Sequence, residues 1–306
     1  MRIVSLLPSA TEIVCALGLQ SSLVGVTHEC DFPPAVLNLP KVTHSLIPKD
    51  ASSAEIDALV SSRLKTSVAL YTLNMPVLEA LRPDVLITQA LCDVCAVSEE
   101  EVSDAACRLP GRPRVLNLEP QTLEQVFETM LVVGKATDVE STAEEAVAAL
   151  QRRVDAVSRV TAQIPQALRP RVAFLEWLDP PFNGGHWNPS LIELAGGVDL
   201  LGEANMPSRR MDWSAVSAAD PDLLFISCCG FSVERTMQDM PILAGRQGWN
   251  EMRCVREKRV YITDGNAYFS RPGPRLVDAL ELLAHTLHPK IHPESSGRVE
   301  GWLGSS

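Results

Sequence analysis

The sequence predicts an α/β protein with two similar lobes, each built on a parallel sheet, bridged by one long helix and with a ligand cleft between the lobes. Short apolar strands alternate with helices along the chain, which is typical of parallel sheets covered by helices. Motifs of the first half recur in the second half in the same order. Between the halves, residues 141–164 carry apolar side chains at helical spacing, and Pro165 ends the pattern. We therefore expect an N-terminal lobe (1–138), a linker helix (139–165), a C-terminal lobe (166–288) and a loosely held tail (289–306).

In the first lobe, apolar runs predict strands at 2–7, 23–27, 85–88 and 114–118. Helices are expected near 9–17, 54–64, 77–81 and 122–135, and after Ser98. Capping boxes, in which a hydroxyl and an acid or amide three residues later satisfy the first helical amides, are expected at Ser9, Thr122 and Ser141.

The second lobe repeats this pattern. Strand 171–175 corresponds to the first strand, and a helix opened by Asn188 and Pro189 corresponds to the one opened by Pro8 and Ser9. The motif 220–227 corresponds to 82–88, and 258–263 to 113–118. A helix at 275–287 closes the lobe, and His285, His288 and His292 are expected to face solvent.

Composition excludes several classes of protein. The net charge is -11 and no cluster of Lys and Arg is present, so a nucleic-acid partner is not expected. No apolar run is long enough for membrane insertion. No signal peptide follows Met1, so we expect a cytoplasmic protein with its eight cysteines reduced, or a periplasmic one if the native reading frame carries an upstream leader. Walker, GxSxG, HExxH and GxGxxG motifs are absent, and this favours a binding protein over an enzyme, although Glu29 beside His28 and Cys30 keeps an enzyme possible.

Ligands of open parallel sheets bind outside the carboxyl ends of the strands. The loops expected there supply polar anchors, aromatic side chains for a flat apolar ligand, imidazoles able to bind a metal, and one guanidinium able to pair with a carboxylate or phosphate. The alternatives are ordinary packing for the aromatic residues, loop hydrogen bonds for the histidines, and a tie between loops for the guanidinium. The candidate ligand-binding residues are Ser9, His28, Glu29, Tyr71, Gln89, His186, Trp187, Phe231, Asn266, Tyr268, Phe269 and Arg271. The glycines 184 and 185 before Asn188 additionally suggest an anion at that helix N-terminus.

Five cysteines also fall at predicted strand ends, namely Cys30, Cys92, Cys95, Cys228 and Cys229. One CxxC motif can hold a metal, form a redox pair, or be simple buried thiols. If the five thiols converge, they suit zinc, copper(I), an iron–sulfur cluster or the metal of a bound ligand. Cys15, Cys107 and Cys254 are expected to be structural.

Several motifs carry a family resemblance: 3–12 (IVSLLPSATE), Gly18, Arg-Pro-Asp84, Gly-Gly-His-Trp187 and 269–274 (FSRPGP). In these the chain resembles the helical-backbone substrate-binding proteins of ABC importers, nearest to the vitamin B12-binding members. The resemblance implies two α/β lobes bridged by a rigid helix, a corrinoid, haem or ferric siderophore as ligand, and an ABC permease as partner if the protein is exported. The cleft cysteines and the missing export signal depart from that family.

Two main functions follow. The first is a binding protein, not an enzyme, for a cobalamin-like or other metal-containing small molecule. The alternative is a cytoplasmic protein with its own thiolate metal centre, zinc or iron–sulfur, that acts in metal handling or as an enzyme. A third possibility is a transport receptor that has lost its leader sequence.

Overall fold

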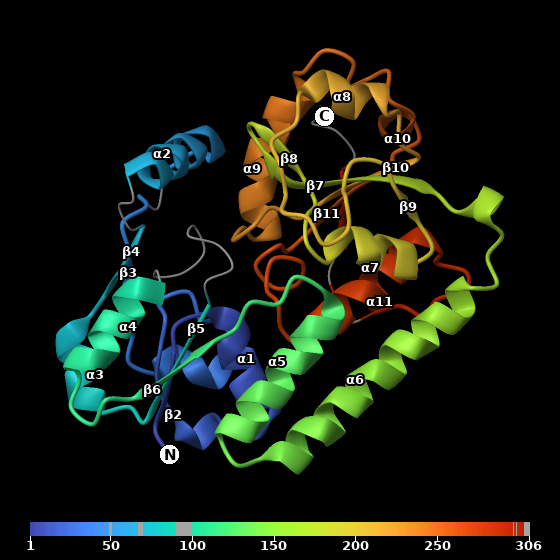
Figure 1. Ribbon diagram of the computed structural model, residues 1–306. Coiled ribbons are helices and arrows are strands. Elements are labelled where there is room, and N and C mark those ends of the chain that lie inside the picture. Colours follow the sequence, from blue (N-terminus) through green and yellow to red (C-terminus); the bar gives the residue numbers. More distant parts are fainter. Residues whose placement is uncertain (49–50, 67–69, 90–98, 296, 298, 303–306) are drawn as a thin grey trace. The chain divides into compact units, whose positions relative to one another are not determined.

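The computed structural model (Figure 1) describes residues 1–48, 51–66, 70–89, 99–295, 297 and 299–302. The chain forms two compact units. The first comprises Met1–Ala51 and Glu55–Ala149, and the second comprises Ser52–Ala54 and Leu150–Ser306. The boundary between them falls inside the long helix α6 (Glu140–Thr161), which confirms the helix predicted at 141–164. The predicted α/β class with parallel sheets is confirmed as well.

The first unit has a parallel four-stranded sheet in the order β2-β1-β5-β6. A separate antiparallel pair, β3 with β4, was not predicted. The strands are β1 (Ile3–Ser5), β2 (Leu23–Val26), β3 (Thr43–Ser45), β4 (Tyr71–Leu73), β5 (Val85–Thr88) and β6 (Arg114–Asn117). The helices are α1 (Pro8–Ala16), α2 (Ser53–Thr66), α3 (Met75–Leu81), α4 (Glu99–Arg108) and α5 (Leu123–Ala136), with short 3-10 turns at Gln20–Ser22 and Pro34–Asn38.

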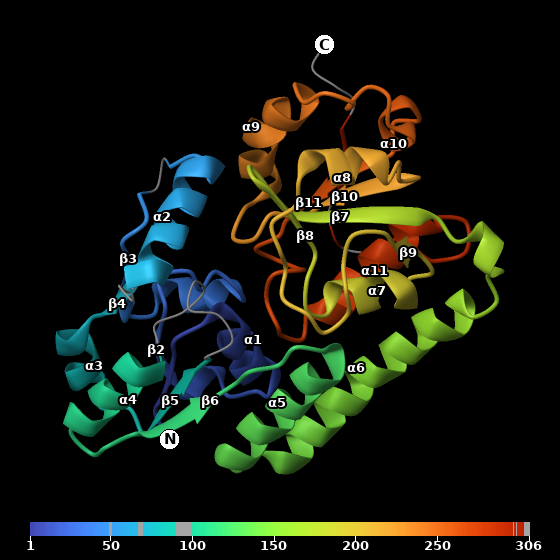
Figure 2. The same ribbon diagram turned by 45° about the horizontal axis from the view of Figure 1, so that its top comes forward.

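The second unit has a larger sheet in the order β12-β11-β10-β7-β8, with β9 also paired to β7 (Figure 2). A 3-10 turn (Gln166–Leu168) follows α6. The strands are β7 (Arg171–Leu178), β8 (Pro181–Asn183), β9 (Val198–Asp199), β10 (Leu223–Ile226), β11 (Val260–Thr263) and β12 (Val299–Gly301). The helices are α7 (Asn188–Leu194), α8 (Trp213–Ala218), α9 (Val233–Ala244), α10 (Arg253–Arg256) and α11 (Leu276–Leu287).

The internal repeat is confirmed by strand order. The parallel run β2-β1-β5-β6 in the first unit matches β9-β7-β10-β11 in the second, strand for strand along the chain. One loop shows the match in detail. Asp84 accepts a hydrogen bond from the backbone N of Arg2 at 2.6 Å, and Asp222 accepts the same bond from Arg171 at 2.9 Å. Each aspartate therefore ties the start of one strand to its neighbour.

Left-handed backbone recurs at equivalent places. Gly18 (φ 74) and Gly196 (φ 88) follow α1 and α7, where helices favour glycine after their last turn. Arg82 (φ 44) lies two residues before Asp84, and Asp220 (φ 39) lies two residues before Asp222. Arg112 and Lys258 also have positive φ, two residues before β6 and β11. A side chain at positive φ costs free energy, so its recurrence indicates that the same turn geometry is needed in both units.

The apolar core of the second unit holds three phenylalanines. The rings of Phe174 on β7 and Phe225 on β10 stack at 5.6 Å, and Phe269 contacts both at 5.2 and 5.3 Å. All three rings are almost fully buried. On the opposite face, a cluster that includes Leu175 and Ile226 packs against α8, α9 and α10.

Helix starts correct two of the predicted capping boxes. Helix α1 begins at Pro8 after the extended residue Leu7 and has no side-chain cap, because proline at the first helical position already sets the backbone, so Ser9 lies inside the first turn. Helix α6 begins at Glu140, so Ser141 is also inside its helix. Ser98 lies outside the described residues. The box at Thr122 is confirmed in its main bond, since its hydroxyl accepts from the backbone N of Gln125 at 3.2 Å.

Removing this cap tests the assignment. Thr122→Ala leaves the backbone N of Gln125 without its acceptor, and we expect a loss of about 1 kcal/mol in the free energy of unfolding. The measurement is urea unfolding followed by circular dichroism. Thr122→Ser keeps the hydroxyl and serves as the control. Equal destabilisation of both variants would contradict the capping role.

The tail departs from the prediction. Strand β12 pairs antiparallel with β11, so the tail is not loosely held where the structure describes it. His292 is also not solvent-facing: it is 5% exposed, and its carbonyl contacts Nδ1 of His285 at 3.1 Å. His288 ties the end of α11 to the carbonyl of Gly196 through Nε2 at 3.0 Å. The imidazole of His292 is therefore buried, and burial keeps it neutral.

This buried imidazole predicts a pH dependence. Burial first, and then the nearby His288 and His285, lower the pKa of His292 below its usual value. The folded state thus resists protonation, and stability present above about pH 6.5 is lost as the pH falls through that value. We expect His292→Gln to reduce the difference in the free energy of unfolding between pH 7.5 and pH 5 by up to about 1 kcal/mol. An unchanged pH dependence, measured by urea unfolding, would contradict this assignment.

Candidate functional site

The carboxyl ends of β1, β2, β5 and β6 meet at one edge of the first sheet because these strands are parallel. Thr27, His28 and Glu29 follow β2 directly. Val26 forms a bridge with Lys41, and Val42 donates its backbone N to the carbonyl of Val26 at 2.9 Å. This pairing brings β3, and with it Thr43, alongside Thr27.

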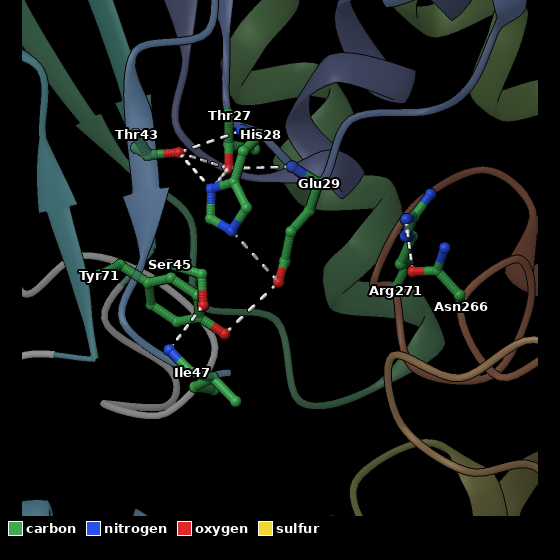
Figure 3. A network of polar contacts seen from close by, with 9 residues as sticks. All are labelled: Thr27, His28, Glu29, Thr43, Ser45, Ile47, Tyr71, Asn266 and Arg271. Atoms are coloured by element: carbon green, nitrogen blue, oxygen red, sulfur yellow. Dashed lines mark hydrogen bonds and ion pairs between the residues drawn. The ribbon is translucent and has the colours of Figure 1, made fainter. Parts of the chain in front are cut away.

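The hydroxyl of Thr43 is the centre of a polar network (Figure 3). It accepts from the backbone N of His28 at 3.1 Å and lies 2.7 Å from Nδ1 of the same residue. It donates to the hydroxyl of Thr27 at 2.8 Å. Thr27 and Thr43 are buried. Thr43 therefore contacts His28 at both its backbone N and its ring Nδ1, which fixes the orientation of the imidazole.

Glu29 and Tyr71 lie on the other side of the ring (Figure 3). Nε2 of His28 is 3.8 Å from Oε1 of Glu29, and the hydroxyl of Tyr71 donates to the same oxygen at 3.4 Å. The rings of His28 and Tyr71 lie 5.5 Å apart. The Glu29 side chain is 42% exposed, whereas Tyr71 is 8% exposed. Three of the predicted ligand-binding residues are thus brought together.

Burial first, followed by His44 and Lys41, lowers the pKa of His28. The ring is consequently neutral at physiological pH, as metal binding through imidazole requires. Within the described part of the chain, Nε2 of His28 has no hydrogen-bond partner.

Ser9 and Gln89 lie at the same edge. Both are buried, Ser9 in the first turn of α1 and Gln89 just after β5. The side-chain oxygen of Gln89 has no hydrogen-bond partner among the residues that the structure describes.

In the second unit, Glu176 lies on β7, and its side chain reaches the N-terminus of α7. Its carboxylate accepts from the backbone N of Gly185 at 3.2 Å and from the side chain of Asn188 at 3.4 Å. Burial raises the pKa of the Glu176 carboxyl. The predicted anion site before Asn188 is therefore wrong, because the protein's own carboxylate fills it. The glycines serve packing instead, since a Cβ on Gly185 would lie 2.1 Å from the backbone N of Ser208.

Several predicted ligand contacts of the second unit are part of its interior. Trp187 is 4% exposed and donates its indole N–H to the carbonyl of Phe269 at 2.8 Å, and Phe269 belongs to the phenylalanine core. Arg271 is buried and donates to the Asn266 side chain at 2.5 Å (Figure 3), so it ties one loop together. These contacts give structural roles to residues that were predicted to touch a ligand.

His186, Phe231 and Tyr268 remain partly exposed. His186 has positive φ (54), stacks on Trp187 at 5.5 Å, and has a pKa that is lowered by burial. Phe231 packs at 4.8 Å from Trp177, with the guanidinium of Arg235 4.3 Å from its ring centre. Burial raises the pKa of Tyr268.

The described thiols occupy different environments. Cys30 is buried and lies 3.0 Å from the hydroxyl of Thr11. Cys228 is in the apolar core, where burial raises its pKa strongly, whereas its neighbour Cys229 is exposed. Cys92 and Cys95 lie outside the described residues. Across the described ranges, no group of three or more His, Cys, Asp or Glu side chains is placed to hold a metal ion.

Sequence reasoning missed Thr27 and Thr43. Neither belongs to a motif, and the bond between them depends on the pairing of β3 beside Val26. It also missed the contact of Arg235 with Phe231, which depends on where α9 starts after β10.

Comparison with known proteins gives a consistent result. A family model described as periplasmic binding protein matches residues 3–267. The chain is 23% identical to an uncharacterized ABC transporter substrate-binding lipoprotein of Bacillus subtilis, over 96% of this chain and 82% of the relative. It is 22% identical to the vitamin B12-binding protein of Vibrio cholerae, over 92% of this chain and 86% of the relative.

A solved structure shares the fold. The periplasmic haem-binding protein of Pseudomonas aeruginosa superposes with a TM-score of 0.71 at 22% identity, over 96% of this chain and 95% of that one. Among the described helices, none is both long and apolar enough to cross a membrane. The expectation of a cytoplasmic protein is wrong, because the matching family model is that of periplasmic proteins and one relative is a lipoprotein.

Proposed function

Because the chain belongs to the periplasmic binding protein family, we propose that it binds a metal-bearing small molecule outside the cytoplasm and delivers it to an ABC permease. The ligand proposed first is a cobalamin-like corrinoid, and the second candidate is haem. Relatives that bind vitamin B12 and haem support both choices.

The observation that carries this proposal is the Nε2 atom of His28. It belongs to a ring with a lowered pKa, lies at the carboxyl edge of a parallel sheet, and has no hydrogen-bond partner among the described residues. Neutral imidazole nitrogen is a common ligand for cobalt and iron. The Glu29 carboxylate lies 3.8 Å from Nε2, is 42% exposed, and accepts a hydrogen bond from Tyr71.

Other side chains at the carboxyl edges support an apolar planar ligand with polar substituents. The largely buried ring of Tyr71 lies beside His28, and Gln89 has a buried side-chain oxygen at the same edge that lacks a hydrogen-bond partner among the described residues. Pockets for such ligands are mostly apolar with a few polar anchors.

The thiolate centre is not proposed. No relative reported above is named for a protein-bound metal, and Cys228 is held in an apolar core with a raised pKa, whereas a thiolate ligand needs a lowered one.

The test is a titration of the ligand-free protein with hydroxocobalamin, with haemin, and with a ferric trihydroxamate whose iron is fully coordinated. We expect stoichiometric binding of hydroxocobalamin, with an absorption shift as imidazole replaces cobalt-bound water. A shift with haemin alone would favour the second candidate. Tight binding of the ferric trihydroxamate and of neither macrocycle would overturn the proposal.

A further inference from the structure

We propose that Thr43 is a positioning residue that fixes His28 as the tautomer with its proton on Nδ1, so that Nε2 presents a lone pair. The tautomer itself follows from hydrogen bonds within the first unit. Its use, to select ligands whose metal has an exchangeable axial position, rests on the proposed function.

The hydroxyl of Thr43 has one proton, and it donates that proton to Thr27 at 2.8 Å. Towards His28 it can therefore only accept. It accepts the backbone N–H of His28 at 3.1 Å, and its closer contact, 2.7 Å to Nδ1, then requires a proton on that ring nitrogen, which also lies 3.3 Å from the hydroxyl of Thr27. A neutral imidazole carries one N–H, so Nε2 is the bare nitrogen.

The surroundings of Nε2 agree with this assignment. The Glu29 carboxylate lies 3.8 Å from Nε2, beyond hydrogen-bond distance, which is consistent with a ring nitrogen that carries no proton. The same carboxylate oxygen accepts the Tyr71 hydroxyl instead. The two ring nitrogens therefore differ. Nδ1 forms a hydrogen bond with Thr43, whereas Nε2 has no hydrogen-bond partner within the described part of the chain.

This arrangement discriminates between ligand classes. A bare nitrogen can form a dative bond to a metal that releases a water molecule from an axial position. It cannot donate a hydrogen bond, so it offers nothing to a chelate whose metal is saturated and whose surface is lined with acceptor oxygens. Hydrogen bonds to the distal nitrogen of a metal-binding histidine set its tautomer and ring orientation, and their loss commonly costs about 10–100-fold in affinity.

The first experiment reads the tautomer without any ligand. In the ligand-free full chain labelled with 15N, long-range correlation spectra of the histidine ring distinguish a proton on Nδ1 from one on Nε2. We expect the Nδ1–H form for His28, assigned by its absence in His28→Ala. The Nε2–H form in the wild-type protein would overturn the proposal, whatever ligand the protein binds.

The second experiment uses matched variants. Thr43→Val keeps the branched shape that suits strand β3 but has no hydroxyl, and Thr43→Ser restores the hydroxyl. We expect Thr43→Val to lose the single tautomer and to bind hydroxocobalamin about 10–100-fold more weakly, with a diminished absorption shift. Thr43→Ser should recover both. Equal loss in both variants, at unchanged circular dichroism, would overturn the positioning role.

The two proposals fail in different ways. If hydroxocobalamin and haemin do not bind but the Nδ1–H form is found in the wild type and lost in Thr43→Val, the tautomer lock stands and the ligand class is wrong. If a macrocycle binds while His28 keeps its tautomer in Thr43→Val, the ligand class stands and the role of Thr43 is wrong.

Discussion

Replacing His28 with alanine is expected to abolish the absorption shift of bound hydroxocobalamin and to weaken binding by more than the roughly 10–100-fold typical of an outer hydrogen-bond partner. The reason is that the variant removes the atom proposed to contact the metal, not only its support. Titration followed by absorption spectroscopy and by calorimetry gives both quantities. Because the side chain is held by Thr43 and only partly buried, the fold should survive.

Two histidine controls sharpen this result. His44 lies on β3 close to the network but is exposed and contacts Asn74 at 3.2 Å. Because His44 contributes to lowering the pKa of His28, the comparison is made at pH 8, where an imidazole is neutral even at its ordinary pKa, and there His44→Ala should bind the ligand as the wild type does. His186→Ala removes the other predicted imidazole. If the absorption shift disappears in His186→Ala and persists in His28→Ala, then the proposed metal ligand is the wrong histidine.

Replacing Phe174 with alanine should cost about 3–5 kcal/mol in the free energy of unfolding, because the cavity left beside two packed rings cannot close. The Phe225 ring lies 5.6 Å and the Phe269 ring 5.2 Å from that of Phe174, and these two rings lie 5.3 Å from each other. The main chain of Gly184 also packs against the Phe174 ring, since a Cβ there would come within 2.7 Å of it. The loss should therefore loosen the loop that carries His186 as well.

The chain supplies its own probe for this experiment. All five tryptophans lie at or after Trp177, within the second unit, so tryptophan fluorescence in urea reports the unfolding of that unit. Leu168→Ala is the control, because that side chain is 69% exposed and its truncation should change stability by no more than about 0.5 kcal/mol. A change of similar size in Phe174→Ala would show that the phenylalanine cluster does not support the unit.

The architecture was predictable because it repeats. Apolar runs such as 85–88 and 223–226, each preceded by Pro and Asp, mark corresponding strands by local residues alone. The β3–β4 pair was missed because each strand has three residues and its pairing joins segments distant in the chain. Strand β12 was missed because Pro, Gly and Ser dominate the tail around it.

The site was predictable only in part. His28, Glu29 and Tyr71 were singled out from the sequence as polar and aromatic side chains near strand ends, and the structure brings them into one network; that they bind a ligand stays a prediction. Trp187 and Phe269 carry the same residue chemistry, yet the structure buries them, and nothing in a sequence separates an aromatic ring that lines a ligand from one that fills a core. Thr43 could not be predicted from the sequence, because its proposed role depends on its contact with His28, and that contact exists only once the chain before β3 pairs beside Val26.

The left-handed residues that recur in the two units bear on the origin of the chain. Arg82 and Asp220, like Arg112 and Lys258, differ in chemistry but share one unfavourable backbone geometry at one place in the topology. Convergence would be expected to install glycine at such positions, since glycine adopts that geometry without cost. Non-glycine residues at both members of each pair instead point to descent by tandem duplication from a half-length ancestor, after which the halves were free to diverge.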